Sequence, residues 1–341
     1  MYSKFYRRAA WPRVLWCKTT FVKNESSSRT ARTHSPRLPN SRSVIMITLL
    51  LLSLFSSSHA SDWLEMPDGK LYHVSCVHHH EQNFHVEHIE GDGSTVVKED
   101  GTKTFLPPCA YPTRTRTNEV SYYSDWSVYA ETTSDSTGYP YNFMTSAWQV
   151  PPAPTSRGPL GLSSVYLFNG LEDGAGKRGN ASLILQPVLQ FGKSGCLLNP
   201  LDWGNWWITG YLVDGNGRAH CGKTIKVQPN DTVVGNMTQT DAASNTWAVS
   251  ASANGVVSSY TISLPASKIF DAAYVTLEGM VIYNCATYPH GGGVSFTNIG
   301  VANEKGPIAK SVWKPEIRHS ECQQEVSVAS SDQVKLIWQS A

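Results

Sequence analysis

Charged residues are scarce in this sequence of 341 residues, because Asp, Glu, Lys and Arg together make up only 16% of it. The basic residues are also unevenly placed, since residues 1–45 hold ten Lys or Arg against one acid. The rest of the chain therefore has a net charge of −8, with 18 basic residues against 26 acidic ones. A chain without a basic surface attracts phosphate backbones weakly, which excludes nucleic-acid binding.

Apolar runs long enough to cross a bilayer as a helix are also lacking. The run Val44–Phe55 has only twelve residues, and small and polar residues follow it up to Ser58-His59-Ala60. This pattern predicts a secretory signal cleaved before Ser61. We therefore expect residues 1–60 to be a basic leader and signal peptide, and the mature protein to be secreted, extracellular and without a stable membrane anchor. Two alternatives are translation from Met46 and a mitochondrial leader; the apolar run favours secretion.

Familiar catalytic motifs are absent as well. The sequence has no His-Glu-x-x-His metalloprotease helix and no Gly-x-Ser-x-Gly nucleophile turn. The stretch Asp135-Ser-Thr-Gly138 has no second copy that would supply the partner carboxylate of an aspartic dyad. The glycines 291–293 have no strand and helix around them to form a phosphate cradle. We expect no cofactor.

A fixed Cys/His metal spacing is missing too, although histidines gather between residues 73 and 88. His78 and His80 share one strand face, and with His73, His85 or His88 they form an alternative zinc set. Histidine runs without fixed spacing are usually unliganded, so we expect no metal site. A second hypothesis is a pH trigger. Imidazoles ionise near pH 6.5, so a segment rich in them gains positive charge on acidification and detaches from an acid-acting enzyme.

Cysteine is present in an informative number. Of the seven, Cys17 lies in the expected leader, which leaves six: Cys76, Cys109, Cys196, Cys221, Cys285 and Cys322. An even count after a signal peptide predicts disulfides and excludes a thiol nucleophile. We expect nearest neighbours to pair, because each pair closes a modest loop. Sequons at Asn180, Asn230 and Asn236 predict glycosylation on the secretory route.

Short strands and turns dominate the rest of the chain. Apolar runs recur between turn residues at 163–169, 181–192, 206–213, 223–227, 231–237, 245–250, 256–264, 273–285 and 293–302. This rhythm predicts an all-β sandwich. We expect a strand and a connecting loop over 122–157, and a small, His-rich, β-rich domain or prosegment over 61–121, with short strands at 71–77 and 84–89. The sandwich domain is then 122–341, and we expect a monomer.

Two segments are unusual in having almost no charge. Gly179–Gly192 has none, and its alternation puts Leu183, Leu185, Leu189 and Phe191 on one face and Ile184, Gln186, Val188 and Gln190 on the other. Within 272–303 the only charged residue is Glu278. Alternation there puts Val275, Leu277, Val281 and Tyr283 on one face and Tyr274, Thr276, Glu278 and Met280 on the other. A lone carboxylate in a neutral strand must be solvated, hydrogen-bonded or protonated.

The order of several motifs resembles the glutamic peptidases of the eqolisin type. Those motifs are Ile184-Leu185-Gln186, Asn205-Trp206-Trp207 before Tyr211, Ile225–Val233, Tyr274–Glu278 and Val294–Asn298. The resemblance covers about 163–302 and implies an antiparallel, concanavalin A-like jelly-roll sandwich. It implies that Gln186 and Glu278 are the catalytic pair of an acid-acting endopeptidase. If residues 61–121 are a prosegment, the enzyme is made as a zymogen.

The resemblance also implies substrate-binding residues. It places Trp207 in the substrate groove, and it matches Asn169 to an aspartate of the family. Gln190 lies two pleats from Gln186 on the same face, and Tyr274 shares a face with Glu278, so both are further candidates. The sequence departs from the family at Pro187, directly after the glutamine, and in an insertion that contains Cys196.

The chemistry of the pair is coherent. Peptide hydrolysis needs a base for water and a donor for the oxyanion, which a carboxylate and an amide supply. The partners implied are polypeptide substrates. Three alternatives are that the two side chains only decorate a solvated sheet face, that the sandwich binds glycans or cell-wall polymer through exposed tryptophans, and that it is a relative without activity.

Overall fold

The structure is a computed structural model, and it describes residues 62–68, 70–81, 83–89, 93–115, 123–174, 183–197, 199–214 and 217–340. The expected leader and signal peptide, the sequon at Asn180 and the expected cleavage before Ser61 lie outside these residues. Residues 60–341 form one compact unit. The described part of 61–121 therefore does not form a separate unit from 122–341.

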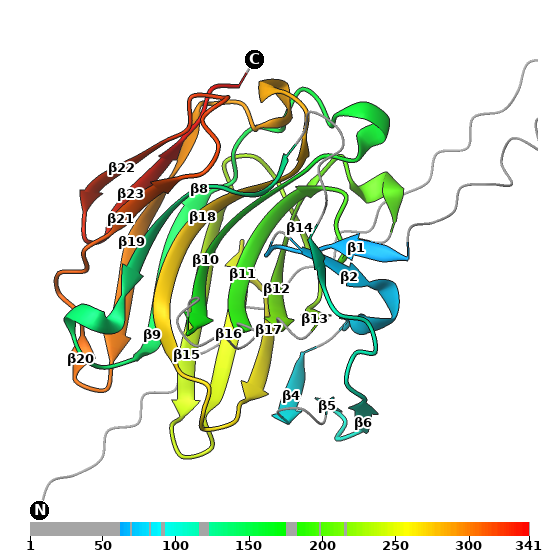
Figure 1. Ribbon diagram of the computed structural model, residues 1–341, viewed down its shortest axis with the longest axis vertical. Coiled ribbons are helices and arrows are strands. Elements are labelled where there is room, and N and C mark those ends of the chain that lie inside the picture. Colours follow the sequence, from blue (N-terminus) through cyan, green and yellow to red (C-terminus); the bar gives the residue numbers. More distant parts are fainter. Residues whose placement is uncertain are drawn as a thin grey trace, which may run out of the picture. The chain divides into compact units, whose positions relative to one another are not determined.

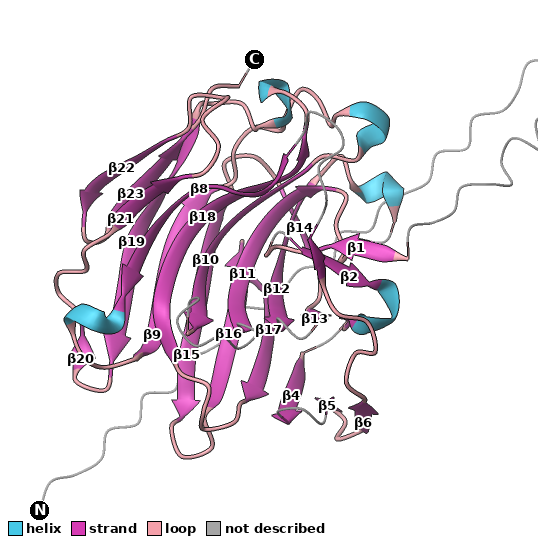
Figure 2. Ribbon diagram, viewed as in Figure 1, coloured by secondary structure: helices cyan, strands magenta, loops and turns pink. Residues whose placement is uncertain are grey.

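Strands account for nearly all the regular structure, which confirms the all-β prediction (Figures 1 and 2). The N-terminal strands are β1 (Trp63–Glu65), β2 (Lys70–His73), β3 (Val77–His79), β4 (Phe84–Ile89), β5 (Gly93–Lys98), β6 (Lys103–Leu106) and β7 (Arg114–Thr115). The described helical segments are short 3₁₀ turns: η1 (Val74–Cys76), η2 (Ser134–Ser136), η3 (Pro159–Gly161), η4 (Pro200–Asp202) and η5 (Cys285–Thr287). None of them is long and apolar enough to cross a membrane.

One layer of the sandwich carries the candidate site, and we call it the inner sheet. Its strands follow the order β21–β8–β18–β10–β11–β12–β13–β3, with β14 also on β12. They are β8 (Tyr123–Thr133), β10 (Ser164–Asp173), β11 (Leu183–Gly192), β12 (Trp206–Asp214), β13 (Arg218–Cys221), β14 (Ile225–Val227), β18 (Phe270–Ile282) and β21 (Lys314–Ile317), with β3 at the edge.

The second layer, the outer sheet, packs against the inner one. Its order is β19–β9–β15–β16–β17–β4–β5–β6. The strands after β6 are β9 (Tyr141–Gln149), β15 (Thr232–Asp241), β16 (Thr246–Ala253), β17 (Val256–Ser263) and β19 (Gly293–Asn303), and β20 (Gly306–Pro307), β22 (Glu325–Ser330) and β23 (Gln333–Ile337) extend this end. The strands 183–192 and 293–303 match the predicted runs closely, whereas 122–157 holds two long strands, β8 and β9, rather than one strand and a loop.

The main core lies between the two sheets and is built from alternate residues of each strand. On β11 these are Leu183, Leu185, Leu189 and Phe191, as predicted. On β18 the expected face is kept by Val275 and Leu277. It is lost at Val281, because a register shift between Gly279 and Ile282 turns Ile282 into the core instead. Val281 has φ +56 at this bulge, a conformation that β-branched residues rarely adopt.

Three disulfides join the pairs expected from the sequence: Cys76–Cys109, Cys196–Cys221 and Cys285–Cys322. Cys196–Cys221 ties the loop after β11 to β13 of the inner sheet. Cys76–Cys109 lies wholly within the N-terminal residues 62–115, so it adds no covalent link between these residues and the sandwich. Three disulfides are compatible with an extracellular protein.

Candidate active site

Glu278 lies in a transverse row of side chains on the inner-sheet face that points away from the main core. It pairs with Tyr166 of β10, and Tyr166 pairs with Gln190 of β11. The row continues to Trp207 on β12 and to Trp126 on β8. Directly opposed residues share a face, and neighbouring strands are about 4.8 Å apart, so the backbones of Glu278 and Gln190 are about 10 Å apart. The register therefore brings one carboxylate and one amide into the same row, on either side of Tyr166.

Gln186 lies on the same face but in a different row. The strand registers put Tyr274 opposite Gly170, and Gly170 level with Gln186. Gln186 and Gln190 are four residues apart on one strand, which corresponds to about 13 Å. The amide that shares a row with Glu278 is therefore Gln190, whereas the sequence resemblance had singled out Gln186.

A tyrosine orients the Gln190 amide. Gln190 is 0% exposed, and its Oε1 accepts a hydrogen bond from the Tyr211 hydroxyl. Its Nε2 has no hydrogen-bond partner among the described residues. Burial raises the pKa of Tyr211, and the charge of Glu278 adds to this against the hydrogen bond with Ser194, so the phenol stays protonated and remains a donor. The Nε2 hydrogens of Gln190 are thereby left to donate to an oxygen of a ligand.

The Glu278 carboxylate is 0% exposed, and three buried tyrosines are close enough to feel its charge. Burial is the main cause of a raised pKa at Tyr72, Tyr166 and Tyr211, and the negative charge of Glu278 raises the pKa of each of them further. Neutral phenols around a carboxylate can donate hydrogen bonds to it without adding charge. Glu278 thus lies among phenols that stay neutral near neutral pH, and the hydroxyl of Tyr72 donates to a second carboxylate, Asp68 Oδ2, at 2.8 Å.

Two other predicted residues lie on this face. Trp207 is half-buried, and its Nε1 donates to the Asp202 carbonyl at 3.0 Å. Tyr274 is buried, and its hydroxyl donates to Glu131 Oε1 at 3.3 Å. Tyr274 and Glu131 line a cleft of about 360 Å³ that extends along the face from the row of Gln186. Asp68 and Lys70 of the N-terminal residues also line this cleft, whereas Trp207 does not.

Asn169 does not lie on this face. Its neighbours Leu167 and Leu171 on β10 belong to the main core, so its side chain points between the sheets. There its Nδ2 donates to the Gly235 carbonyl of β15 at 3.3 Å. A Cβ on Gly235 would come within 2.2 Å of Asn169 Oδ1, so the contact requires a glycine. The expectation that Asn169 binds substrate is therefore corrected: it joins the two sheets.

Sequence reasoning missed three residues of the site: Trp126, Tyr166 and Tyr211. All three are buried on the face of Glu278 in a second, smaller hydrophobic cluster. The Trp126 ring packs edge-on against Tyr274, with 4.9 Å between ring centroids. Strand alternation alone would have placed Tyr166 on the face opposite Leu167, but only the pairing of strands sets it between Gln190 and Glu278.

An N-terminal hairpin, formed by β1 and β2, covers this face. Its Met66 and Tyr72 are 0% exposed and belong to the cluster that contains Tyr166 and Tyr211. The carbonyl oxygen of its Pro67 accepts a hydrogen bond from Gln186 Nε2 at 2.7 Å. With the hairpin in this position Glu278 is 0% exposed, so the face is closed to a large ligand.

The remaining N-terminal strands pair with one edge of each sheet. β3 pairs in parallel with β13 of the inner sheet, and β4 pairs in parallel with β17 of the outer sheet. β7 pairs with β2, and its Arg114 guanidinium lies 3.7 Å from the Trp63 ring centroid. Because the Cys76–Cys109 disulfide is internal to this segment, one cut between residues 115 and 123 would leave residues 62–115 held only by non-covalent contacts.

Part of the histidine cluster lies where β3 meets β13. His80 Nε2 is 3.2 Å from Nδ1 of His220, and the His80 ring stacks on Phe84 at 3.9 Å. Burial lowers the pKa of His80 to about 4, with the charges of His78, His79 and Lys98 adding to the shift. Burial also lowers the pKa of His78, His79 and His85. Among the described residues, no group of His, Cys, Asp or Glu is arranged to hold a metal ion.

Acid should weaken the hold on residues 62–115 once the chain is cut between 115 and 123. The pKa of His80 is lower when the segment is bound than when it is free, so binding is unaffected above pH 6.5 and weakens as pH falls toward 4. A change from 6.5 to about 4, reduced for partial solvent exposure, corresponds to about 10- to 100-fold in affinity. Dissociation measured by size-exclusion chromatography at pH 7 and pH 4.5 would check this, with His80→Gln showing the smaller change.

The comparison of His80→Gln with the unchanged chain must also allow for the titration of Asp68. Burial raises the pKa of Asp68, against the charge of Lys70, so protonation of Asp68 strengthens binding as pH falls. Asp68→Asn removes this opposing titration. If His80→Gln in the Asp68→Asn chain keeps the full acid effect, His80 does not carry it.

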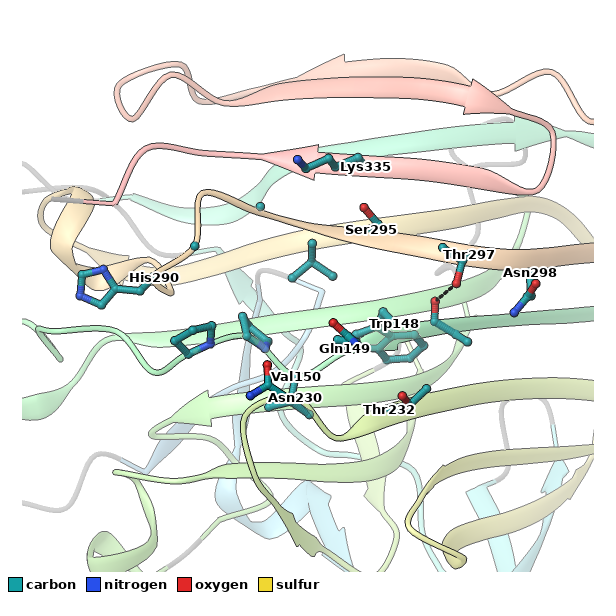
Figure 3. Close-up of a pocket in the computed structure, with 16 residues that line it drawn as sticks. Trp148, Gln149, Val150, Asn230, Thr232, His290, Ser295, Thr297, Asn298 and Lys335 are labelled. Carbon is teal, nitrogen blue, oxygen red and sulfur yellow. Dashed lines mark hydrogen bonds between the residues drawn. The ribbon is translucent and has the colours of Figure 1, made fainter.

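A groove of about 510 Å³ lies elsewhere, where β19 leaves β9 to pair with β23 (Figure 3). Gln149, Asn230, Ser295 and Thr297 contribute polar groups to it, and no carboxylate lines it. Its tryptophan, Trp148, is 2% exposed, so the ring offers no surface on which a sugar could stack. The groove therefore gives no specific support to glycan binding.

The fold and the row of side chains together define a two-layer β-sandwich with a carboxylate–amide pair on one sheet face. No protein-family model matches the chain, and no curated protein sequence matches it. Among solved structures, the chain is similar to scytalidoglutamic peptidase bound to a peptide-based transition-state analogue, with TM-score 0.44 and 15% identity over 64% of this chain and 100% of that one.

Two further solved structures are also similar to the chain. SCP-B, a member of the eqolisin family of peptidases in complex with the tripeptide Ala-Ile-His, has TM-score 0.42 and 15% identity over 64% of this chain and 100% of its own. Aspergilloglutamic peptidase from Aspergillus niger has TM-score 0.35 and 15% identity over 52% of this chain and 99% of its own.

Proposed function

We propose that this protein is a secreted glutamic-type endopeptidase that acts at acid pH, with Glu278 as the general base and Gln190 as the oxyanion donor. The observation that carries the proposal is the row across β18, β10 and β11, in which Glu278 and Gln190 flank Tyr166. Gln190 is preferred to Gln186 because a donor to the oxyanion must lie near the base that activates the water. Tyr211 positions the amide and has no direct part in the chemistry.

The reaction follows from these groups. Glu278 takes a proton from a water molecule, whose oxygen attacks the peptide carbonyl carbon. The carbonyl oxygen becomes an oxyanion that accepts a hydrogen bond from Gln190 Nε2. The protonated Glu278 then gives its proton to the amide nitrogen, the C–N bond breaks, and the products are a carboxylic acid and an amine. One carboxyl group thus serves as base and then as acid.

The acid optimum and the zymogen form belong to the same proposal. The hairpin blocks the site, so activity requires its displacement after a cut in the chain. A lowered pKa of His80 where β3 meets β13 supports loss of the N-terminal segment in acid. Glycosylation at Asn230 and Asn236 stays a prediction. Asn230 is exposed, and Asn236 is half-buried with its Oδ1 accepting from Thr145.

Replacing Glu278 with Gln tests the proposal. The substitution keeps the shape of the side chain and removes the base, so cleavage of a denatured protein between pH 2 and 7 should fall by about 10²- to 10⁴-fold. Residues 61–341, cut between 115 and 123, would be used. The matched control is Glu316→Gln, an exposed carboxylate on β21 of the same sheet, which should leave the rate unchanged. Cleavage that survives Glu278→Gln would refute the assignment.

A further inference from the structure

Only one of the two polar atoms of the Gln186 amide, Nε2, is hydrogen-bonded to the covering hairpin. Its Nε2 donates to the Pro67 carbonyl oxygen at 2.7 Å, and both residues are buried. Its Oε1 is also buried, and it has no hydrogen-bond partner among the described residues. Gln186 itself is 0% exposed, so water does not satisfy this oxygen from bulk solvent. A buried acceptor without a partner is unfavourable, and natural proteins keep few of them.

Gln186 Oε1 has no donor in the described part of the chain, because the residue that faces it is a proline, Pro67. In an extended chain, the N–H and the C=O of one residue point to the same side, so a carboxamide can bond to both at once. Proline has a carbonyl but no N–H. Pro67 can therefore accept from Gln186 Nε2, yet it has no hydrogen to donate to Oε1.

Two observations on Glu65 show that the chain just before Pro67 lies near the row of Glu278 and Gln190. Its charge is one of the causes of the raised pKa of Tyr166, after burial and the charges of Tyr211 and Glu278. Its carbonyl oxygen accepts from the Gly195 amide, beyond the end of β11, at 3.4 Å. The stretch from Glu65 to Pro67 thus runs from the row of Gln190 toward Gln186, which is the path that an extended substrate would take along the face.

We propose that Gln186 binds the main chain of the substrate, donating to the C=O and accepting from the N–H of one residue, in the place that Pro67 occupies. This inference rests on the proposed function and names the substrate class: extended polypeptide with any residue except proline at that place. The hairpin then occupies the place of the substrate but makes one of the two hydrogen bonds that Gln186 offers. Once a cut has released the hairpin, a substrate residue in this place makes one hydrogen bond more than Pro67 does, so the substrate competes with the freed hairpin peptide. Gln186 is in this account a specificity-determining residue.

Peptide affinity tests this without depending on catalysis. The Glu278→Gln chain, cut between Val74 and Ser75 and freed of its own N-terminal peptide, is titrated with three synthetic peptides of residues 61–74. They carry at position 67 proline, alanine or N-methylalanine. We expect the alanine peptide to bind about 2- to 12-fold more tightly than the other two, because it alone supplies an N–H. N-Methylalanine controls for the ring of proline, since it also lacks the hydrogen.

A substitution at Gln186 is the control for the three-peptide comparison. Gln186→Met keeps the length of the side chain and removes both hydrogen bonds, so the three peptides should then bind with equal affinity. Equal affinity of the alanine and N-methylalanine peptides for the chain with Gln186 overturns the inference, and so does a difference that persists in Gln186→Met or a failure of all three to bind. Because the readout is binding, it decides the inference even if the chain hydrolyses no peptide.

Discussion

Cutting the chain between Val74 and Ser75 is expected to raise peptidase activity by about 10²- to 10⁴-fold. Val74 is 46% exposed in the η1 turn, so a protease recognition sequence placed there is accessible in the folded protein. The cut frees the hairpin, whose Met66 and Tyr72 are fully buried on the site face. Burying two such side chains contributes about 3–6 kcal/mol to closure, and each 1.4 kcal/mol is tenfold in an equilibrium constant.

The measurement is the initial rate on a quenched fluorescent peptide at pH 4, before and after the cut. The uncut chain is its own control, since it differs in one peptide bond. The disulfide Cys76–Cys109 and the pairing of β3 with β13 stay in place after this cut, so the change isolates the hairpin from the rest of the N-terminal segment. Equal rates before and after release of the peptide would mean that the hairpin does not obstruct the site.

Gln190→Ala is expected to lower kcat by about 10²- to 10³-fold, the cost of losing one oxyanion donor. The reason is that Nε2 of Gln190 is the buried amide donor in the row of Glu278. Tyr211→Phe should lower kcat by a smaller factor, because Gln190 keeps its donor but loses the hydrogen bond that orients it. Steady-state kinetics separate the two roles, since neither change should raise KM as much as it lowers kcat.

The strand pattern of the sequence predicted most of the sandwich for a simple physical reason. Leu183, Leu185 and Leu189 lie an even number of residues apart and all face the main core, as the two-residue period of a strand requires. The prediction was wrong over 122–157, where turn residues around the η2 turn hid two long strands, β8 and β9. The bulge at Val281 was not predictable either, since nothing in the local sequence marks the extra residue.

The candidate site shows the limit of strand alternation more clearly. Gln186 and Gln190 are four residues apart, so alternation places both on the face of Glu278 and cannot choose between them. The choice depends on which residues of β10 stand opposite β11 and β18, and those pairings are made between segments far apart in the sequence. A resemblance of local motifs selected Gln186, and the register selects Gln190. The predicted face of Glu278 was right, because alternation within a single strand decides which face a residue lies on.

The most direct test of this account is the single-turnover rate constant of Gln190→Ala compared with that of Gln186→Ala, in chains freed of the hairpin and saturated with the same peptide. Saturation removes differences in substrate binding, so only the chemical step is compared. The account predicts that Gln190→Ala lowers this rate constant by about 10²- to 10³-fold while Gln186→Ala leaves it nearly unchanged and raises the concentration needed for saturation. The reverse order, with the large loss at Gln186, would contradict the pairing of Glu278 with Gln190.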